Sequence, residues 1–251
     1  MTNIKFQPLE WPQSIVEIDA LARASKIPDE KIDDLWRVHD LMAKLFSGRY
    51  RGSGRPFLNH LAGTAGLALI HGYDSKIVLA GYAHAAYAQG EFGGVIQGAT
   101  EVNRKTLRAV IGDEAEALVF AYKDFDWLAQ LEQFSSATQL SVSDQDRSLL
   151  LVRFVNELED SMDFSVYDKN GFEQCLSRLS KGAAMADWFG NVSLAAQMRK
   201  QISDLRGREL VNNFGLRPKR SQTIANLQFM LKPGVKIGRK AKNLFSRLRR
   251  R

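Results

Sequence analysis

Apolar residues recur at helical spacing along almost the whole chain. In the segment that begins at Asp29, for example, Ile32, Leu35, Met42 and Leu45 fall on one face of a helix. Runs that alternate apolar and polar residues between turn signals, which are typical of strands, are missing. Because so many apolar helix faces must pack on one another, the sequence predicts an all-α helical bundle.

Capping residues and glycines indicate where these helices begin and end. Ser14 and Asp29 can cap the first two helices, and Ser75 can cap a helix that continues to about Tyr87. Glycine-rich loops interrupt the pattern at 48–54 and 89–94, and Gly112 separates two helices. The remaining helices are predicted at 57–71, 103–111, 113–123, 143–162, 171–186 and 191–206.

Composition places the chain among ordinary globular proteins, with 45% hydrophobic and 25% charged residues in 251. A single cysteine, Cys175, cannot form an internal disulfide, which favours a reducing compartment. The first residues have no apolar stretch of the kind found in signal peptides. The most apolar region, 61–87, contains charged residues and falls short of the roughly 20 apolar residues that a membrane span needs. We therefore expect a soluble, cytoplasmic protein.

Positive charge is concentrated at the end of the chain. Residues 217–251 contain twelve Lys or Arg and no acidic residue, which leaves 23 basic and 28 acidic residues in the rest. The basic character therefore belongs to the tail, and the body is slightly acidic. We divide the chain into an N-terminal extension with a helix (1–27), a helical domain (28–210) and a basic tail (211–251).

The tail has the pattern of a basic amphipathic helix. Its apolar residues share one face, and basic residues cover the remainder. Such a helix suits the anionic inner face of a membrane, which makes peripheral membrane attachment the first expectation. Nucleic acid is a less favoured partner, because it has little need for a clean apolar face; docking on the acidic body of the same or a neighbouring chain also stays open. The residues expected at the membrane are Lys236, Arg239, Lys240, Phe245 and Arg247.

Two of the four histidines, His60 and His84, lie on consecutive predicted helices among small residues. Small neighbours let helices approach closely, so both imidazoles are expected in one crevice. From spacing alone, two buried core histidines and a metal site are both open. His39 is interpreted as a packed core residue, and His71 as a helix-terminal residue.

The run RGSGRPFLNHLAGTAGLALIHGYDSKIVLAGYAHAAY (51–87) resembles the opening of an HD domain, especially that of bacterial ppGpp synthetase/hydrolases. VIGDEAEALVFAYKD (110–124) and LLLVRFVNELEDSM (149–162) are similar to later segments of that family. The likeness covers about residues 28–165, and FLxHLxGT followed by LAGYAHAAYAQGEF looks closest to an uncharacterised HD-like subfamily. It implies an HD-like helical bundle, with His60 and His84 as metal ligands.

Several family positions are changed in this sequence. Ala85 replaces the aspartate of the His-Asp pair, and Asn156 replaces the late aspartate. Ala88 and Gln89 stand where the ppGpp hydrolases have a Glu-Asp pair. An HD site holds a divalent ion that lowers the pKa of a bound water. Without both aspartates, the usual phosphohydrolase chemistry is in doubt.

Other residues offer substitutes for part of the lost site. Asn156 is a candidate third ligand beside His60 and His84, and Glu91 can serve as the catalytic acid if its loop folds over the crevice. On the same helix, Asp160 shares a face with Asn156 whereas Glu157 points elsewhere. A solvated loop position is the competing interpretation of Glu91.

A cluster of arginines precedes His60 and suits an anionic ligand. Arg49, Arg51 and Arg55 can bind phosphate or carboxylate in a bidentate manner. They are the expected substrate-binding residues, although simple surface positions explain them equally well.

Two functions therefore stay open. The first is a metal-dependent hydrolase of the HD type, with Mn, Fe or Zn, that acts on a phosphorylated or other anionic small molecule. The second is a catalytically inactive HD-like binding or scaffold module that its tail recruits to the membrane surface. A homo-oligomer is compatible with either function.

Overall fold

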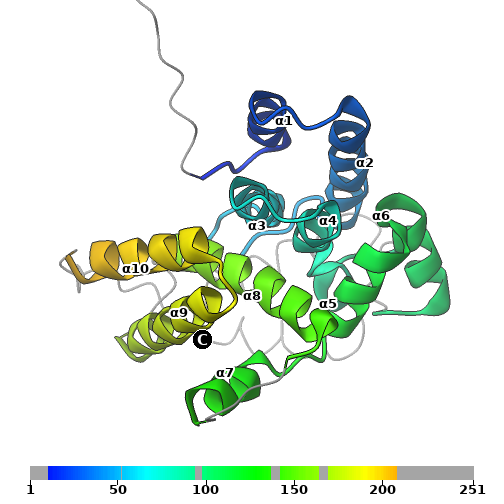
Figure 1. Ribbon diagram of the computed structural model, residues 1–251. Helices are drawn as coiled ribbons and strands as arrows, with labels where there is room; N and C mark the ends of the chain where they lie inside the picture. The colour runs from blue at the N-terminus through cyan, green and yellow to red at the C-terminus, as the bar shows by residue number, and fades with distance from the viewer. Residues whose placement is uncertain (1–10, 52, 94–97, 137–141, 164–168, 208–251) are drawn as a thin grey trace, which may run out of the picture.

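The computed structural model describes residues 11–51, 53–93, 98–136, 142–163 and 169–207. These residues form ten helices and no strand, and one isolated β-bridge pairs Tyr50 with Pro56. The predicted all-α class is confirmed. The helices in Figure 1 are α1 (Ile15–Ala24), α2 (Asp29–Leu45), α3 (Phe57–Ile70), α4 (Ser75–Ala83), α5 (Ala86–Gln89), α6 (Glu101–Tyr122), α7 (Trp127–Ser136), α8 (Asp144–Met162), α9 (Lys169–Trp188) and α10 (Val192–Gly207).

Local sequence signals account for several helix boundaries. The Ser14 hydroxyl accepts a hydrogen bond from the Glu17 amide, and Ser143 caps α8 in the same way. Gly112 has φ 81° and ψ 168° inside α6, so the backbone kinks where the sequence predicted a break. The two helices predicted on either side of Gly112 are therefore the two arms of the kinked α6.

The region after Gly72 differs from the prediction in two ways. Asp74, not Ser75, occupies the N-cap position of α4, and the helix expected to reach Tyr87 stops at Ala83. His84 Nδ1 lies 2.7 Å from the Gly81 carbonyl oxygen, so the imidazole engages a carbonyl near the end of the helix. This side-chain contact accompanies the turn between α4 and α5. The short helix α7 was not predicted.

Helix α3 lies in the interior and has helices on several sides. It packs against α1, α2, α4 and α8, and Phe57 and residues 60–68 are all buried. Small residues at many of these positions allow the close packing that the sequence predicted. Gly63 and Gly66 face the segment before α1: an ideal Cβ on Gly66 would lie 2.2 Å from Pro12 Cγ.

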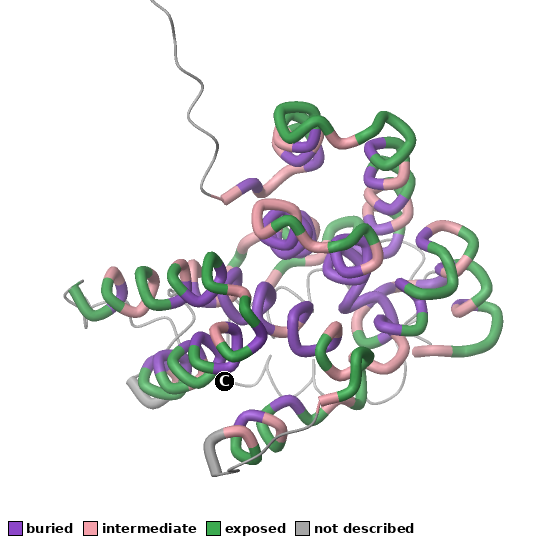
Figure 2. Tube along the Cα trace, viewed as in Figure 1, coloured by how far each residue is buried: buried purple, intermediate pink, exposed green. Residues whose placement is uncertain are grey.

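Helix α8 runs through the centre of the fold, and α3, α4, α6, α9 and α10 pack around it. Figure 2 shows the buried sides of these helices turned toward one another. The interior of α8 includes polar side chains among its apolar ones, because Asn156, Glu157 and Glu159 are all buried. Buried polar groups need partners, so these side chains are expected to contact charged or polar groups on neighbouring helices.

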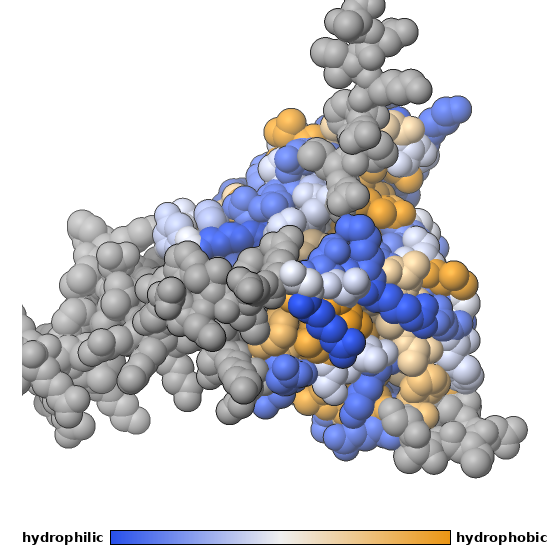
Figure 3. Space-filling model, turned by 90° about the vertical axis from the view of Figure 1, so that its left-hand side faces the viewer, coloured by the Kyte–Doolittle hydropathy of each residue, from blue (hydrophilic) through white to orange (hydrophobic). Residues whose placement is uncertain are grey.

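The N-terminal helix belongs to the same core. Ile15, Ile18 and Ala22 of α1 are buried, and α1 packs on α2 and α3. On the face of the molecule shown in Figure 3, hydrophilic and hydrophobic residues are interspersed. Among the described helices, none combines the length and the apolar character that crossing a membrane requires.

Gly66→Ala is expected to destabilise the protein by about 1–3 kcal/mol, because the new methyl group overlaps Pro12 and forces the segment before α1 to move. Urea unfolding followed by circular dichroism measures this loss.

Gly81→Ala is the matched control for this substitution. Its Cβ would lie 3.5 Å from Thr64 Cγ2, an ordinary contact, and alanine favours a helix. Equal destabilisation by both substitutions would contradict the close contact of Pro12 with α3.

Candidate metal and anion site

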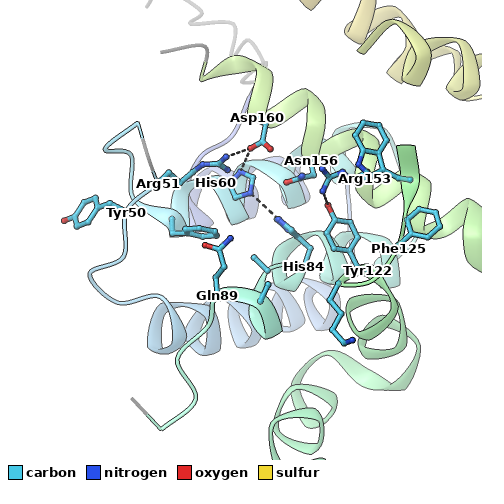
Figure 4. A pocket seen from close by; sticks show the side chains of 15 residues that line it. Tyr50, Arg51, His60, His84, Gln89, Tyr122, Phe125, Arg153, Asn156 and Asp160 are labelled. Carbon is cyan, nitrogen blue, oxygen red and sulfur yellow. Dashed lines mark hydrogen bonds and ion pairs between the residues drawn. The ribbon is translucent and has the colours of Figure 1, made fainter. Parts of the chain in front are cut away.

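A cavity of about 490 Å³ opens beside His60 on α3 and His84 at the end of α4. Helix α8 contributes Arg153, Asn156 and Asp160 to its lining (Figure 4). The cavity therefore brings together His60, His84 and Asn156, the three metal ligands expected from the sequence.

The two imidazoles meet edge to face in the wall of this cavity. His60 Nε2 lies 3.2 Å from His84 Nε2, and both rings are at most 7% exposed. Their other nitrogens have different partners. His60 Nδ1 contacts the Glu159 carboxylate, and His84 Nδ1 lies 2.7 Å from the Gly81 carbonyl oxygen.

These partners indicate which nitrogen of each ring carries the proton. A carbonyl oxygen can only accept, so His84 Nδ1 donates to Gly81. Above its raised pKa of about 7, Glu159 is ionised and likewise accepts from His60 Nδ1. In neutral rings each Nε2 then holds a lone pair, and the two lone pairs face each other across 3.2 Å. Such an arrangement is unfavourable unless a cation lies between or beside the two nitrogens.

Burial keeps both rings neutral. Loss of hydration lowers the pKa of His60 from its usual value of 6.5 to about 3, although Asp160 opposes the change. Loss of hydration, reinforced by His60, also lowers the pKa of His84 to about 3. Neutral imidazole is the form that binds a metal ion.

Glu159 is the most deeply buried acid at the site, with no exposed side-chain surface. Its Oε1 lies 2.5 Å from Arg55 Nη1, and Arg51 Nη1 is 3.9 Å from its Oε2. Burial raises the pKa of Glu159 to about 7, and the two guanidinium groups oppose this rise. Glu159 therefore orients His60 through its Nδ1 atom, while two arginines compensate the charge of the carboxylate.

Two candidate oxygen ligands, Asn156 and Asp160, lie on α8. Asn156 Oδ1 is buried and accepts no hydrogen bond from the described residues, which leaves its lone pairs available. Asp160, one helical turn later, has Oδ1 3.5 Å from His60 Nδ1 and 2.5 Å from Arg51 Nη2. His60, Glu159 and Asp160 offer ligand atoms within 4.8 Å of one another, so this group could hold a metal ion.

The remainder of the lining carries positive charge. Arg51, Lys123 and Arg153 line the cavity, whereas Asp160 is the acid among the lining residues of the described chain. Arg153 donates to the Tyr122 hydroxyl oxygen at 2.9 Å and to Glu157 at 2.7 Å. Three cations against one acid favour an anionic ligand.

The lining also includes the three uncharged residues noted in the sequence. Ala85, Ala88 and Gln89, the positions where the resemblance to the HD family implied acids, all line the cavity. No carboxylate therefore enters from this side of the described cavity. Aromatic rings complete the wall: Tyr50, Phe57, Tyr122, Phe125 and Trp127.

Three predicted site residues lie outside this lining. The Glu91 carboxylate pairs with Arg49 Nη1 at 3.0 Å, and the Glu91 amide donates to the Leu45 carbonyl oxygen. This pairing directs both Glu91 and Arg49 to each other, away from the imidazoles. Arg55 is directed inward, between Glu159 and the Trp11 ring. Of the three expected anion-binding arginines, Arg51 lines the cavity.

The other histidines and the cysteine have structural partners. His39 is partly buried and lies 2.7 Å from the Tyr82 hydroxyl, and His71 contacts Ser193 and Gln197. Cys175 is fully buried. The membrane-binding residues expected at Lys236, Arg239, Lys240, Phe245 and Arg247 lie outside the described residues.

Sequence reasoning missed Glu159, Arg153 and Tyr122. A helical signal existed for two of them, because Arg153 and Glu159 stand three residues before and after Asn156. Tyr122 has no such signal, since α6 reaches the site through tertiary packing. Glu157 is absent from the lining of the cavity, and its carboxylate pairs with Arg153 and Arg178. Its position on the helix predicted that it does not share the face of Asn156 and Asp160.

Residues 41–126 match a family described as a domain of unknown function (DUF6817). No curated protein matches the chain. The matched segment contains Arg51, His60 and His84 but ends before α8, so it omits Asn156, Glu159 and Asp160.

Acid is expected to destabilise the metal-free protein through these histidines. Between pH 6.5 and 4.5, His60 and His84 become protonated in the unfolded chain but stay neutral in the folded protein. Over the same range Glu159 is protonated in the folded protein but ionised in the unfolded chain. The net difference is one proton, so stability falls by about 1.4 kcal/mol per pH unit from these three groups. Urea unfolding at several pH values, with a chelator present, measures the slope.

His84→Gln removes one of the two histidines while it keeps a polar side chain. Its stability is expected to fall less steeply with acid, by about 1.4 kcal/mol per pH unit, over the same range. Parallel pH profiles for wild type and variant would mean that His84 titrates normally in the fold.

Proposed function

We propose that this protein is a metal-dependent hydrolase of the HD type that acts on a phosphorylated or other anionic small molecule. The proposal rests on one observation above all. Two neutral, buried imidazoles direct their Nε2 atoms at each other across 3.2 Å, while both Nδ1 atoms are engaged elsewhere.

This distance suits two ligands of one ion. Zn–N bonds of 2.0–2.1 Å at a tetrahedral angle place two ligand nitrogens about 3.3 Å apart. The contacts at Nδ1 also match a general feature of metal sites, in which a ligating histidine donates its other N–H to a carboxylate or a backbone carbonyl. Glu159 and the Gly81 carbonyl fill these two roles.

The residues that would hold the ion are His60 and His84 through Nε2, with Asn156 Oδ1 and Asp160 from α8. The free lone pairs of Asn156 and the partly exposed position of Asp160 support their part. A divalent ion held by these residues, Mn, Fe or Zn, would supply a bound water of lowered pKa and would polarise a phosphoryl or carbonyl oxygen. Glu159 is excluded from this set because His60 and Arg55 occupy its two oxygens.

The positive lining supports an anionic substrate. Arg51, Lys123 and Arg153 surround the imidazoles, and Arg153 also holds the Tyr122 hydroxyl oxygen. Since Arg153 donates to that oxygen, the Tyr122 hydroxyl can donate its own proton in a hydrogen bond to a ligand. The raised pKa of Tyr122, about 12, keeps this hydroxyl protonated because burial disfavours the phenolate.

A second function is favoured by the same lining. With alanine at 85 and 88 and an amide at 156, Asp160 is the one carboxylate among the described lining residues, and Arg51 neutralises it. Such a cavity suits a module that binds the anion without hydrolysing it. Recruitment of that module to a membrane by the tail remains a prediction.

Metal content distinguishes the two functions. Purified wild-type protein is expected to contain close to one equivalent of Mn, Fe or Zn by plasma mass spectrometry, and His60→Ala and His84→Ala are expected to lose it. His71→Ala is the matched control, because the His71 imidazole does not line the cavity and contacts Ser193 and Gln197 instead. Wild type that binds none of the three ions, even after incubation, would contradict the hydrolase and leave the binding module.

The single His84→Ala variant also tests where the ion lies. If an ion used His60 Nδ1 with Glu159 and Asp160 instead, His84→Ala would retain it. Retention of metal in a folded His84→Ala protein would therefore contradict the Nε2 site.

Glu159→Gln is expected to weaken metal affinity about 10–100-fold without abolishing it, because the amide orients His60 less firmly than the carboxylate. Competition with a fluorescent chelator measures the affinity. Complete loss of binding in a protein with wild-type circular dichroism would make Glu159 a ligand.

A further inference from the structure

The Arg51 guanidinium is shared between two acids of α8. Its Nη2 lies 2.5 Å from Asp160 Oδ1, and its Nη1 lies 3.9 Å from Glu159 Oε2. The backbone around it is held by hydrogen bonds, since the Arg51 amide donates to the Arg55 carbonyl oxygen at 2.8 Å. The two ends of the guanidinium therefore face different partners.

These two acids differ in freedom. Glu159 is completely buried and also contacts Arg55 and His60, so its carboxylate is fixed. Asp160 has a side chain 23% exposed, lines the cavity and lies beside His60 (Figure 4). One end of Arg51 thus lies near a fixed acid, and the other is paired with a partly exposed acid.

Arg51 differs in this respect from the other two cations of the lining. Arg153 pairs with Glu157, and Lys123 pairs with Asp124, and neither of these acids lines the cavity. In the Arg51–Asp160 pair, both members face the ligand space. A cation in the cavity competes for Asp160, and an anion competes for Arg51.

We propose that the Arg51–Asp160 ion pair couples the two ligands of the cavity, so that a bound divalent cation and a bound anion each strengthen the binding of the other. A cation that attracts Asp160 releases Arg51 Nη2 for an anion, while Glu159 keeps the guanidinium in place. An anion that occupies Arg51 Nη2 releases Asp160 for the cation. This inference rests on the proposed metal site, and the coupling is reciprocal by thermodynamic necessity.

The first experiment measures Mn²⁺ binding by calorimetry with and without inorganic phosphate. For wild type, phosphate is expected to increase the Mn²⁺ affinity at least about fivefold, within the usual range of coupling between sites. Arg51→Gln is expected to bind Mn²⁺ with an affinity that phosphate hardly changes. An equal increase in Arg51→Gln would mean that phosphate acts on the ion alone, and would overturn the proposal.

The second experiment needs no metal and uses phosphate binding to the chelator-treated protein. Asp160→Asn removes the partner of Arg51, so it is expected to increase the phosphate affinity. Asp163→Asn is the matched control, because Asp163, the C-cap residue of α8, also raises the pKa of Arg51 through its charge. If phosphate affinity increases no more in Asp160→Asn than in Asp163→Asn, the effect comes from net charge alone, and this result would overturn the proposal.

The two experiments separate the possible failures. Wild type that binds no Mn²⁺ contradicts the proposed function, and the coupling with it. Normal Mn²⁺ binding that is independent of phosphate contradicts the coupling alone. Circular dichroism of each variant tests whether it is folded. If Arg51→Gln is unstable, the metal-free phosphate binding of Asp160→Asn, at a partly exposed position, still tests the proposal.

Discussion

The hydrogen bonds at the two Nδ1 atoms are the constraint on which the site depends. Glu159 and the Gly81 carbonyl accept from His60 and His84, and this leaves both Nε2 atoms directed into one small space. Without these acceptors either ring could rotate or exchange its tautomer. With them, two lone pairs are forced together in a buried place, and that conflict is the strongest reason to expect a cation.

The surrounding charges are arranged to support a buried carboxylate. Glu159 has no exposed side-chain surface, so an ionised form needs compensation, and Arg55 and Arg51 provide it. Arg55 is held in turn against the Trp11 ring, whose segment packs on the glycines of α3. The close packing at Gly63 and Gly66 thus contributes to the position of Glu159 and, through it, of His60.

Much of the fold could be predicted from the sequence, because helix periodicity, the Ser14 cap and Gly112 are local signals. The convergence of His60, His84 and Asn156 was also predictable, from the resemblance to the HD family and the small residues around both histidines. The division between α4 and α5 was not, since it involves a contact between the His84 side chain and the Gly81 carbonyl. Glu91 was expected near the site, but its pairing with Arg49 depends on a tertiary contact between distant segments.

Both histidines are expected to present a free Nε2 lone pair to the same ion. Long-range ¹H–¹⁵N NMR of the histidine side chains at pH 8, before and after addition of Zn²⁺, tests this arrangement. His60 and His84 are expected to be neutral and protonated at Nδ1 in the metal-free protein, and Zn²⁺ is expected to shift both Nε2 resonances but not those of His71. A proton on Nε2 of either ring in the metal-free protein, or Nε2 resonances that Zn²⁺ leaves unchanged, would contradict a shared Nε2 site.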